Sequence, residues 1–314
     1  MNIWPVHLQP FHDELLSSWM IRLAHSNGYK VHDFYAQYFG QDIQIWNRDI
    51  DTQTPENIIN KLHFYTKQDL SVIKNLSLQS YKNILFLYSN TAILKGVLSV
   101  GINHRLRKKY GLQFCPMCLR EDKIPYYRKY WRIAYLISCP YHGVKLGNRC
   151  FKCNFQITPH RVDMIEKTRL VNKLSIELCS KCFCKLSDTP LVKVSENLDN
   201  FSKKIFEASQ NRFICVNGSL IHPYLFLLGI RCIIQGYIRN LGNEIISKNN
   251  SRAIELLEED DRLKVLIGCS NLLVNWPINF LNYIYKFKHP YTNFISKNNR
   301  EDCCVPFWLY RVFR

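Results

Sequence analysis

The chain has 314 residues, and its 42 Lys and Arg against 25 Asp and Glu give a formal net charge of +17. A hydrophobic content of 47%, with 18 Phe, 18 Tyr and 6 Trp, excludes a disordered chain, and 12 Gly and 12 Pro exclude a collagen-like one. The charge favours a polyanionic partner, nucleic acid or an anionic membrane, over a purely solubilising role.

The first 110 residues predict a domain of short helices, as in a helical DNA-binding module. Apolar residues follow helical spacing from Leu15 to a stop near Gly28, and Asp13 is the expected N-cap. A second apolar pattern begins at Val31 and ends at Gly40, a residue that favours helix termination.

Two further helices are predicted over residues 54–65 and 70–76, the first of them opened by Thr54-Pro55. Short helices hinged at residues 65–67 are compatible with a helix-turn-helix, and an ordinary helical hairpin with solvated lysines is the alternative. The cations of this region expected to contact DNA phosphate are Lys67 and Lys74.

Residues 102–152 are the most basic stretch, with 12 Lys and Arg interleaved with tyrosines and Trp131. Cations beside aromatic rings suit a nucleic-acid surface, because the rings stack on bases and the cations meet phosphate. The alternative is that the aromatics form the core of a small metal-binding domain. A compact run just before the first cysteine pair is expected to contact nucleic acid: Arg105, Arg107, Lys108 and Lys109.

Thirteen cysteines without a secretory signal favour metal binding or free thiols over a disulfide framework. Eight of them lie between Cys115 and Cys184. Within this segment, four two-residue-spaced pairs predict a tandem zinc-finger domain of zinc-ribbon type over residues 111–190. The first zinc ion is assigned to Cys115, Cys118, Cys139 and His142, and the second to Cys150, Cys153, Cys179 and Cys182.

The spacing has a chemical basis, because a two-residue gap lets one tight turn present two donors to one tetrahedral ion. Three points stay open at this level. Adjacent pairing is the simplest arrangement and interleaved pairing is the alternative, Cys184 is an alternative to Cys182, and His160 is an alternative to a thiolate of the second site. Four protein donors leave no open position, so these sites are expected to be structural.

Helical apolar spacing returns beyond residue 190 and predicts a C-terminal helical domain over residues 191–314. The expected helices cover residues 201–213, 224–241, 252–267 and 278–287, with a linker near residues 241–251. The overall expectation is a mainly α protein with small zinc-binding modules: an N-terminal helix-turn-helix domain (1–110), central tandem zinc fingers and a C-terminal helical domain.

Several segments together resemble the TniQ/TnsD family of transposon target-selection proteins. They are residues 14–24, then Phe114-Cys-Pro-Met-Cys-Leu-Arg-Glu-Asp122, then residues 125–132, and finally Cys139-Pro-Tyr-His-Gly143. The resemblance covers roughly residues 4–190, and the combination is specific although no single segment is.

The resemblance implies an adaptor without catalytic activity. Members of this family connect a target-recognising element to a TnsC-like AAA+ regulator of transposition. Shorter members do so on an RNA-guided Cascade complex, often as a homodimer, and the length of this chain favours that kind. The implied partners are therefore Cascade with its guide RNA, the AAA+ regulator and DNA.

No catalytic motif is present: the chain has no P-loop, no GxSxG and no HExxH. The alternative function is a zinc-containing, sequence-specific DNA-binding protein, either an attachment-site binder or a transcription regulator. No apolar run reaches the length of a membrane span, and the chain is expected to be cytoplasmic.

Overall fold

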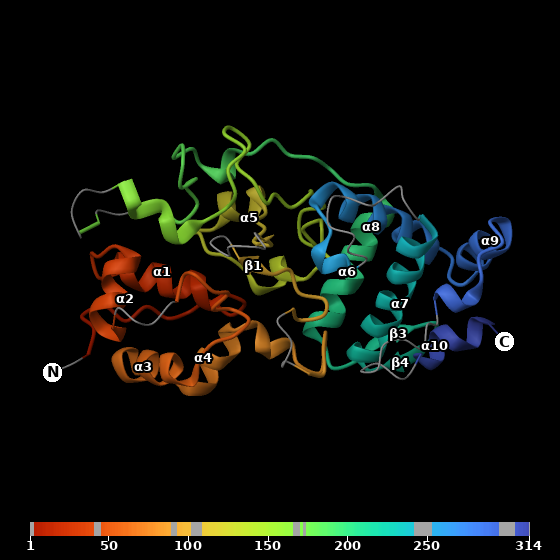
Figure 1. Ribbon diagram of the computed structural model, residues 1–314, viewed down its shortest axis with the longest axis horizontal. Coiled ribbons are helices and arrows are strands. Elements are labelled where there is room, and N and C mark those ends of the chain that lie inside the picture. The colour runs from red at the N-terminus through yellow and green to blue at the C-terminus, as the bar shows by residue number, and fades with distance from the viewer. Residues whose placement is uncertain are drawn as a thin grey trace.

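The computed structural model describes residues 3–40, 45–88, 93–101, 109–165, 170–171, 174–241, 253–294 and 305–313. The molecule is elongated, with the first helices at one end, the last helices at the other, and the cysteine-rich segment between them (Figure 1). Helices dominate, and the strands in the described ranges form two short hairpins. This confirms the predicted mainly α class.

The N-terminal end is built from two helical pairs around an aromatic core. Trp4 lies at the centre of this core, stacked on Tyr65 with ring centroids 5.1 Å apart and packed against Phe34 at 4.6 Å. Apolar residues at helical spacing supply the remaining buried face, as the sequence predicts. The elements are α1 (Leu16–Ser26), α2 (Val31–Phe39), α3 (Glu56–Thr66), α4 (Leu70–Leu76) and the 3₁₀ turn η1 (Leu78–Tyr81).

The first helix does not use its expected N-cap. Leu15 occupies that position, without a side-chain capping bond. Asp13 instead contacts the central segment: its carboxylate accepts a hydrogen bond from the Tyr126 hydroxyl at 3.0 Å, and its carbonyl accepts one from the Lys129 amide at 2.7 Å. The side chain that local sequence predicts to be an N-cap therefore binds Tyr126, which lies more than 100 residues later in the chain.

The central segment, residues 100–188, contains a continuous buried stretch that is called the spine below. Every residue from 127 to 140 is buried. Its backbone bonds to the N-terminal part, for example Leu15 N to Tyr127 O and Leu98 N to Arg132 O, both 2.8 Å. Its short elements are β1 (Val100–Gly101) antiparallel to β2 (Lys109–Tyr110), α5 (Pro116–Glu121), η2 (Lys129–Arg132), η3 (Pro159–Ile165) and η4 (Leu186–Asp188).

The C-terminal end is a helical bundle in which α6, α7 and α8 pack on one another. One expected helix begins later than predicted, at Glu259 rather than at residue 252, and three acidic residues fill its first turn, where they suit the positive end of the helix dipole. The elements are α6 (Glu196–Gln210), β3 (Ile214–Val216), β4 (Ser219–Ile221), α7 (Pro223–Leu241), η6 (Ile254–Leu256), α8 (Glu259–Leu273), α9 (Ile278–Lys286), η7 (Tyr291–Asn293), α10 (Phe307–Tyr310) and η8 (Arg311–Phe313).

Two glycines on α7 admit the aromatic side chains of the last segment. A Cβ at Gly229 would lie 2.1 Å from Trp308, and one at Gly236 would lie 2.2 Å from Phe294. Both rings therefore reach the helix backbone, which fixes the C-terminal elements on the bundle. None of the helices in the described ranges combines the length and the apolar character that a membrane span requires.

Candidate metal centres

The first cluster begins at a helix start. Cys115 is the N-cap of α5, Pro116 follows at the first helical position, and the Cys118 amide donates to the Cys115 sulfur at 3.5 Å. Proline fits this position because its fixed φ suits the helix and the missing N–H has no helical partner there. The helix turn therefore places two sulfurs on one side of the chain.

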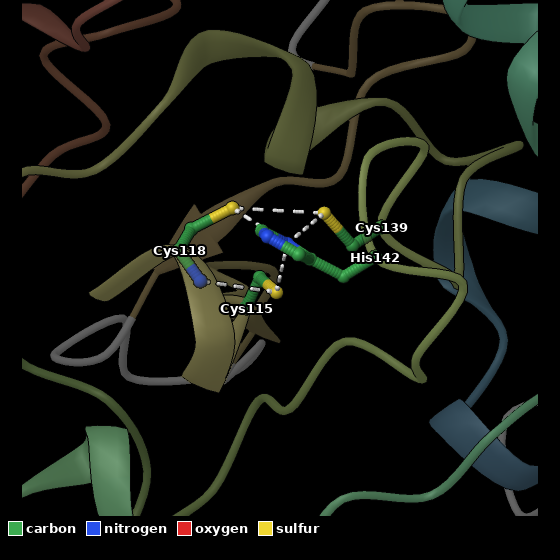
Figure 2. A group of neighbouring side chains, drawn as sticks. All are labelled: Cys115, Cys118, Cys139 and His142. Atoms are coloured by element: carbon green, nitrogen blue, oxygen red, sulfur yellow. Dashed lines mark hydrogen bonds between the residues drawn. The ribbon is translucent and has the colours of Figure 1, made fainter. Parts of the chain in front are cut away.

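The second pair of donors comes from a tight turn. Gly143 adopts a left-handed φ of 61°, and its amide donates to the Cys139 carbonyl at 2.9 Å. This closes the turn, so that Cys139 and His142 both face the two cysteines of α5 (Figure 2).

The donor distances fit a tetrahedral metal ion. Nδ1 of His142 lies 3.5 Å from Sγ of Cys115 and 3.4 Å from the sulfurs of Cys118 and Cys139, which are 3.6 Å apart. Ordinary zinc bond lengths in a tetrahedron place two sulfurs about 3.8 Å apart and a sulfur and a nitrogen about 3.6 Å apart. These four donor distances therefore fit a tetrahedral zinc ion.

Electrostatics also favour a cation here. The pKa of the Cys118 thiol is raised, first by its hydrogen bond with Cys115, then by that with Cys139 and by burial. Thiolates so close together repel one another, and a divalent ion supplies the charge that lets them ionise together. Glu121, which accepts from Nε2 of His142 at 2.9 Å, orients the ring so that Nδ1 faces the sulfurs.

The second cluster joins Cys150, Cys153, Cys179 and Cys182, whose sulfurs all lie within 4.8 Å of one another. Two of the sulfur contacts are Cys150 to Cys182 at 3.5 Å and Cys153 to Cys179 at 3.6 Å. Each two-residue-spaced donor pair is called a knuckle below, and the four knuckles are residues 115–118, 139–142, 150–153 and 179–182. In the structure the first knuckle shares a cluster with the second, and the third with the fourth, so the knuckles are paired adjacently and not interleaved. His160, the alternative donor, stacks on Trp46 instead, with ring centroids 5.3 Å apart.

Comparison with protein families matches residues 5–146 to TniQ. Residues 5–146 therefore form a TniQ domain. The TniQ domain covers the N-terminal helices and all four donors of the first cluster, whereas the second cluster follows it along the chain. No curated protein sequence matches the chain significantly.

The cations expected to contact nucleic acid from the TniQ domain have varied surroundings. Arg105, Arg107 and Lys108 lie outside the described residues, and only the backbone of Lys109 is described, in β2. Lys67 ends α3 in a left-handed conformation with its ammonium 4.8 Å from the Phe64 ring centroid. Lys74 is exposed on α4 and pairs with Glu56 at 3.0 Å.

Three other cations of the basic stretch are structural. Arg132 is fully buried between Asp49 and Asp51, at 2.5 and 3.2 Å. Arg128 pairs with Asp122 at 2.6 Å, and burial lowers the pKa of Lys129 to about 8. These side chains stabilise the spine of the TniQ domain and do not face a nucleic acid, and the neighbouring aromatic rings are core.

The sequence does not predict the roles of two residues at the metal centres, Glu121 and Cys184. Glu121 orients His142, and only its position three residues after Cys118 hints at this. Cys184 was an alternative ligand, and it lies against the second cluster: its sulfur is 3.3 Å from that of Cys150 and 3.4 Å from that of Cys182.

Proposed function

We propose that this protein is a transposition target-selection adaptor that links a target-recognising complex, RNA-guided Cascade, to a TnsC-like AAA+ regulator. The observation that carries the proposal is the TniQ domain over residues 5–146, which supports a role in transposition target selection. The protein works in the cytoplasm and pairs with a second copy of itself on the complex.

The adaptor is held together by two zinc ions, one in each cluster. Each cluster offers four protein donors, so bound zinc has no open position at which to activate water. Zinc there contributes folding free energy rather than chemistry. We accordingly assign the protein no enzymatic activity, and divide it into an N-terminal helix-turn-helix domain (1–110), a zinc-finger domain (111–190) and a C-terminal helical domain (191–314).

The rigid knuckles also anchor a nucleic-acid contact. The run of Arg105, Arg107, Lys108 and Lys109 directly precedes Cys115, and we propose that it meets phosphate of the guide or target together with Lys67 and Lys74. Phosphate contacts release counterions, so binding should weaken with salt by a log–log slope of about −0.9 per contact on duplex DNA.

The adaptor role is tested by capture of the tagged full chain with the Cascade proteins, guide RNA and AAA+ regulator of the same transposon. Retention of Cascade and then of the regulator is expected, and both should require the chain. Sequence-specific retention of naked DNA at physiological salt, with no Cascade bound, would instead support the attachment-site or regulator alternative.

The nucleic-acid contact is tested separately with an alanine variant of all four cations of the run. Its salt slope on duplex DNA should be shallower than that of the wild type, and affinity should fall equally for every sequence. A matched control removes the same charge from exposed C-terminal positions: Arg212, Lys264, Lys286 and Lys288. Equal slopes in the wild type and both variants would refute the contact.

A further inference from the structure

Three of the four metal-binding knuckles share one backbone geometry. The residue four positions after the first cysteine is left-handed in each: Gly143 (φ 61°), Asn154 (φ 55°) and Phe183 (φ 59°). Its amide donates to the carbonyl of that cysteine at 2.9 Å in all three knuckles. The three knuckles therefore share this turn, although their sequences differ.

The shared geometry defines what stands at each position. The metal-facing donor at the third position after the first cysteine is His142, Cys153 or Cys182. The residue at the fifth position is Val144, Phe155 or Cys184. Its carbonyl accepts a hydrogen bond from the amide of the first cysteine, at 2.8 to 3.0 Å. Two knuckles thus carry an apolar residue where the third carries a thiol.

Cys184 is consequently a fifth thiol beside a complete four-cysteine site. It contacts the sulfurs of Cys150 and Cys182 but does not belong to the set of four that lie within 4.8 Å of one another. In the first cluster, the sulfur contacts found among the described residues join only its own four members. Only the second cluster in this part of the chain pairs its ligands with a spare thiol.

Solvent access and a neighbouring thiol coincide at Cys182. Cys153, Cys182 and Cys184 are half-buried, whereas Cys150, Cys179 and all three cysteines of the first cluster are buried. Of the two half-buried ligands, Cys182 is the one whose sulfur contacts that of Cys184, at 3.4 Å. Oxidation-sensitive cysteines combine solvent access with a resolving thiol nearby, and this pair has both.

We propose that Cys184 is a resolving thiol that makes the second zinc site sensitive to peroxide. The Cys182 thiolate attacks one oxygen of hydrogen peroxide and the O–O bond breaks, so that this oxygen becomes part of a sulfenic acid and the other leaves as hydroxide. The Cys184 thiol then attacks the sulfenic sulfur, an S–S bond forms, and water departs. The two cysteines lose two electrons, and one peroxide is reduced to the level of water.

The disulfide leaves the second site with three donors, Cys150, Cys153 and Cys179, which lowers its affinity for zinc. The proposal therefore rests on zinc occupancy of this site, which is part of the proposed function. The first site, with its buried sulfurs and no fifth thiol in contact among the described residues, should keep its ion.

Loss of the second ion would reach the N-terminal helices. The segment between Cys153 and Cys179 extends onto them: Asp163 accepts from the Val31 amide at 2.7 Å, at the start of α2, and from His25 of α1 at 3.1 Å. The Val171 amide donates to the Gly28 carbonyl at 2.9 Å. Oxidation would therefore loosen the α1–α2 turn, which these hydrogen bonds hold in the reduced protein.

The test uses the purified, reduced full chain. Metal analysis first establishes the zinc content, and fewer than two ions per chain at this step would contradict the proposed function rather than the switch. Peroxide is then added while a chromogenic chelator records zinc release and peptide mapping locates disulfides. One of the two ions should leave, with a Cys182–Cys184 disulfide formed at the same rate.

The variant C184S separates the proposal from simple thiolate oxidation. It should bind two zinc ions, release the second more slowly, and retain a Cys182 sulfenic acid that a dione reagent traps. C215S, which removes an exposed thiol elsewhere, should behave as the wild type. Equal release from C184S and wild type, a disulfide that lacks Cys184, or one zinc ion in reduced C184S would each overturn the proposal.

Hydrogen exchange supplies the structural readout. Oxidation should accelerate amide exchange at the α1–α2 turn around Gly28 and Val31, and it should leave the packed core of α6–α8 unchanged. Unchanged exchange at the turn after complete release of the second ion would refute its link to the N-terminal helices.

Discussion

Replacing Arg132 with methionine tests whether the cations of the spine are structural. The arginine is fully buried, and besides its two carboxylate partners it donates to the Leu98 carbonyl at 2.9 and 2.6 Å. Methionine keeps much of the apolar length of the side chain and removes its charge. Asp51, which is 5% exposed, would then be a buried carboxylate whose remaining donors are the amide and hydroxyl of Ser17, each at 2.8 Å.

The expected cost is large because one partner of a buried ion pair is removed. Such deletions cost about 3–5 kcal/mol, a large share of the roughly 5–15 kcal/mol that stabilises a typical domain. At roughly 2–4 °C per kcal/mol for a large domain, the melting temperature should fall by roughly 10 °C. Asp51→Asn in the same background should recover part of this loss, because it removes the unpaired charge and keeps a hydrogen-bonding partner for Ser17.

The pH dependence has a definite sign. Burial, the largest cause, raises the pKa of Asp51 to about 6 even though Arg132 lowers it, so without Arg132 the pKa should rise further. The folded variant then holds a proton that the unfolded chain releases above about pH 4, and its stability increases as pH falls through this interval. The gap between wild type and R132M should therefore be smaller at about pH 5 than at about pH 7.5.

The assay is urea unfolding of the zinc-loaded full chain, with R212M as the control at an exposed position; the control should change stability by less than about 0.5 kcal/mol. A loss of under about 1 kcal/mol in R132M, together with a specific loss of DNA or Cascade affinity, would refute the structural assignment. In that case Arg132 would be a ligand contact that becomes accessible in the complex.

Three further outcomes follow from the geometry. Cys118→Ser should leave the first donor set incomplete, reduce the metal content by one zinc ion per chain and forfeit on the order of 10 kcal/mol of folding free energy, as metal analysis and circular dichroism would record. Gly229→Ala should lower the melting temperature by the equivalent of about 1–3 kcal/mol, because its Cβ would meet the Trp308 ring, and an unchanged melting temperature would contradict that packing. Burial, with the charges of His32 and Arg161, lowers the pKa of His160 to about 3, so the wild type should lose stability as pH falls below about 6.5; His160→Gln should show a weaker loss between about pH 7 and pH 5 in the same unfolding assay, and parallel curves would refute this.

Local chemistry explains why the metal centres were accessible to sequence analysis. A donor pair with a two-residue gap is placed by a single turn, so Cys150 and Cys153 lie together wherever that turn forms. The same applies to the helices of the TniQ domain, whose apolar spacing reports the buried face directly. One local signal was missed: Asn217-Gly218, with φ of 48° and 77°, is the turn of the β3–β4 hairpin, and its Asn-Gly sequence is typical of such turns.

Contacts between distant segments account for what the sequence did not reveal. Whether a cation is structural or binds a ligand depends on the residues that it contacts. Arg132 contacts Asp49 and Asp51, which lie more than 80 residues earlier in the chain. A basic, aromatic-rich stretch therefore has the same composition whether it forms a nucleic-acid surface or a buried spine, and only burial distinguishes the two.

Cys184 illustrates the same division within one motif. The sequence alone left open which of Cys182 and Cys184 is the ligand, since each follows Cys179 within a few residues. Phe183 adopts a left-handed conformation, and the Cys179 amide donates to the Cys184 carbonyl. Together these features place Cys182 with the donors and Cys184 beside them. Spacing along the chain determines which residues are able to share a site, and backbone conformation decides which of them point into it, because a side chain's direction depends on the φ and ψ angles that tertiary packing selects.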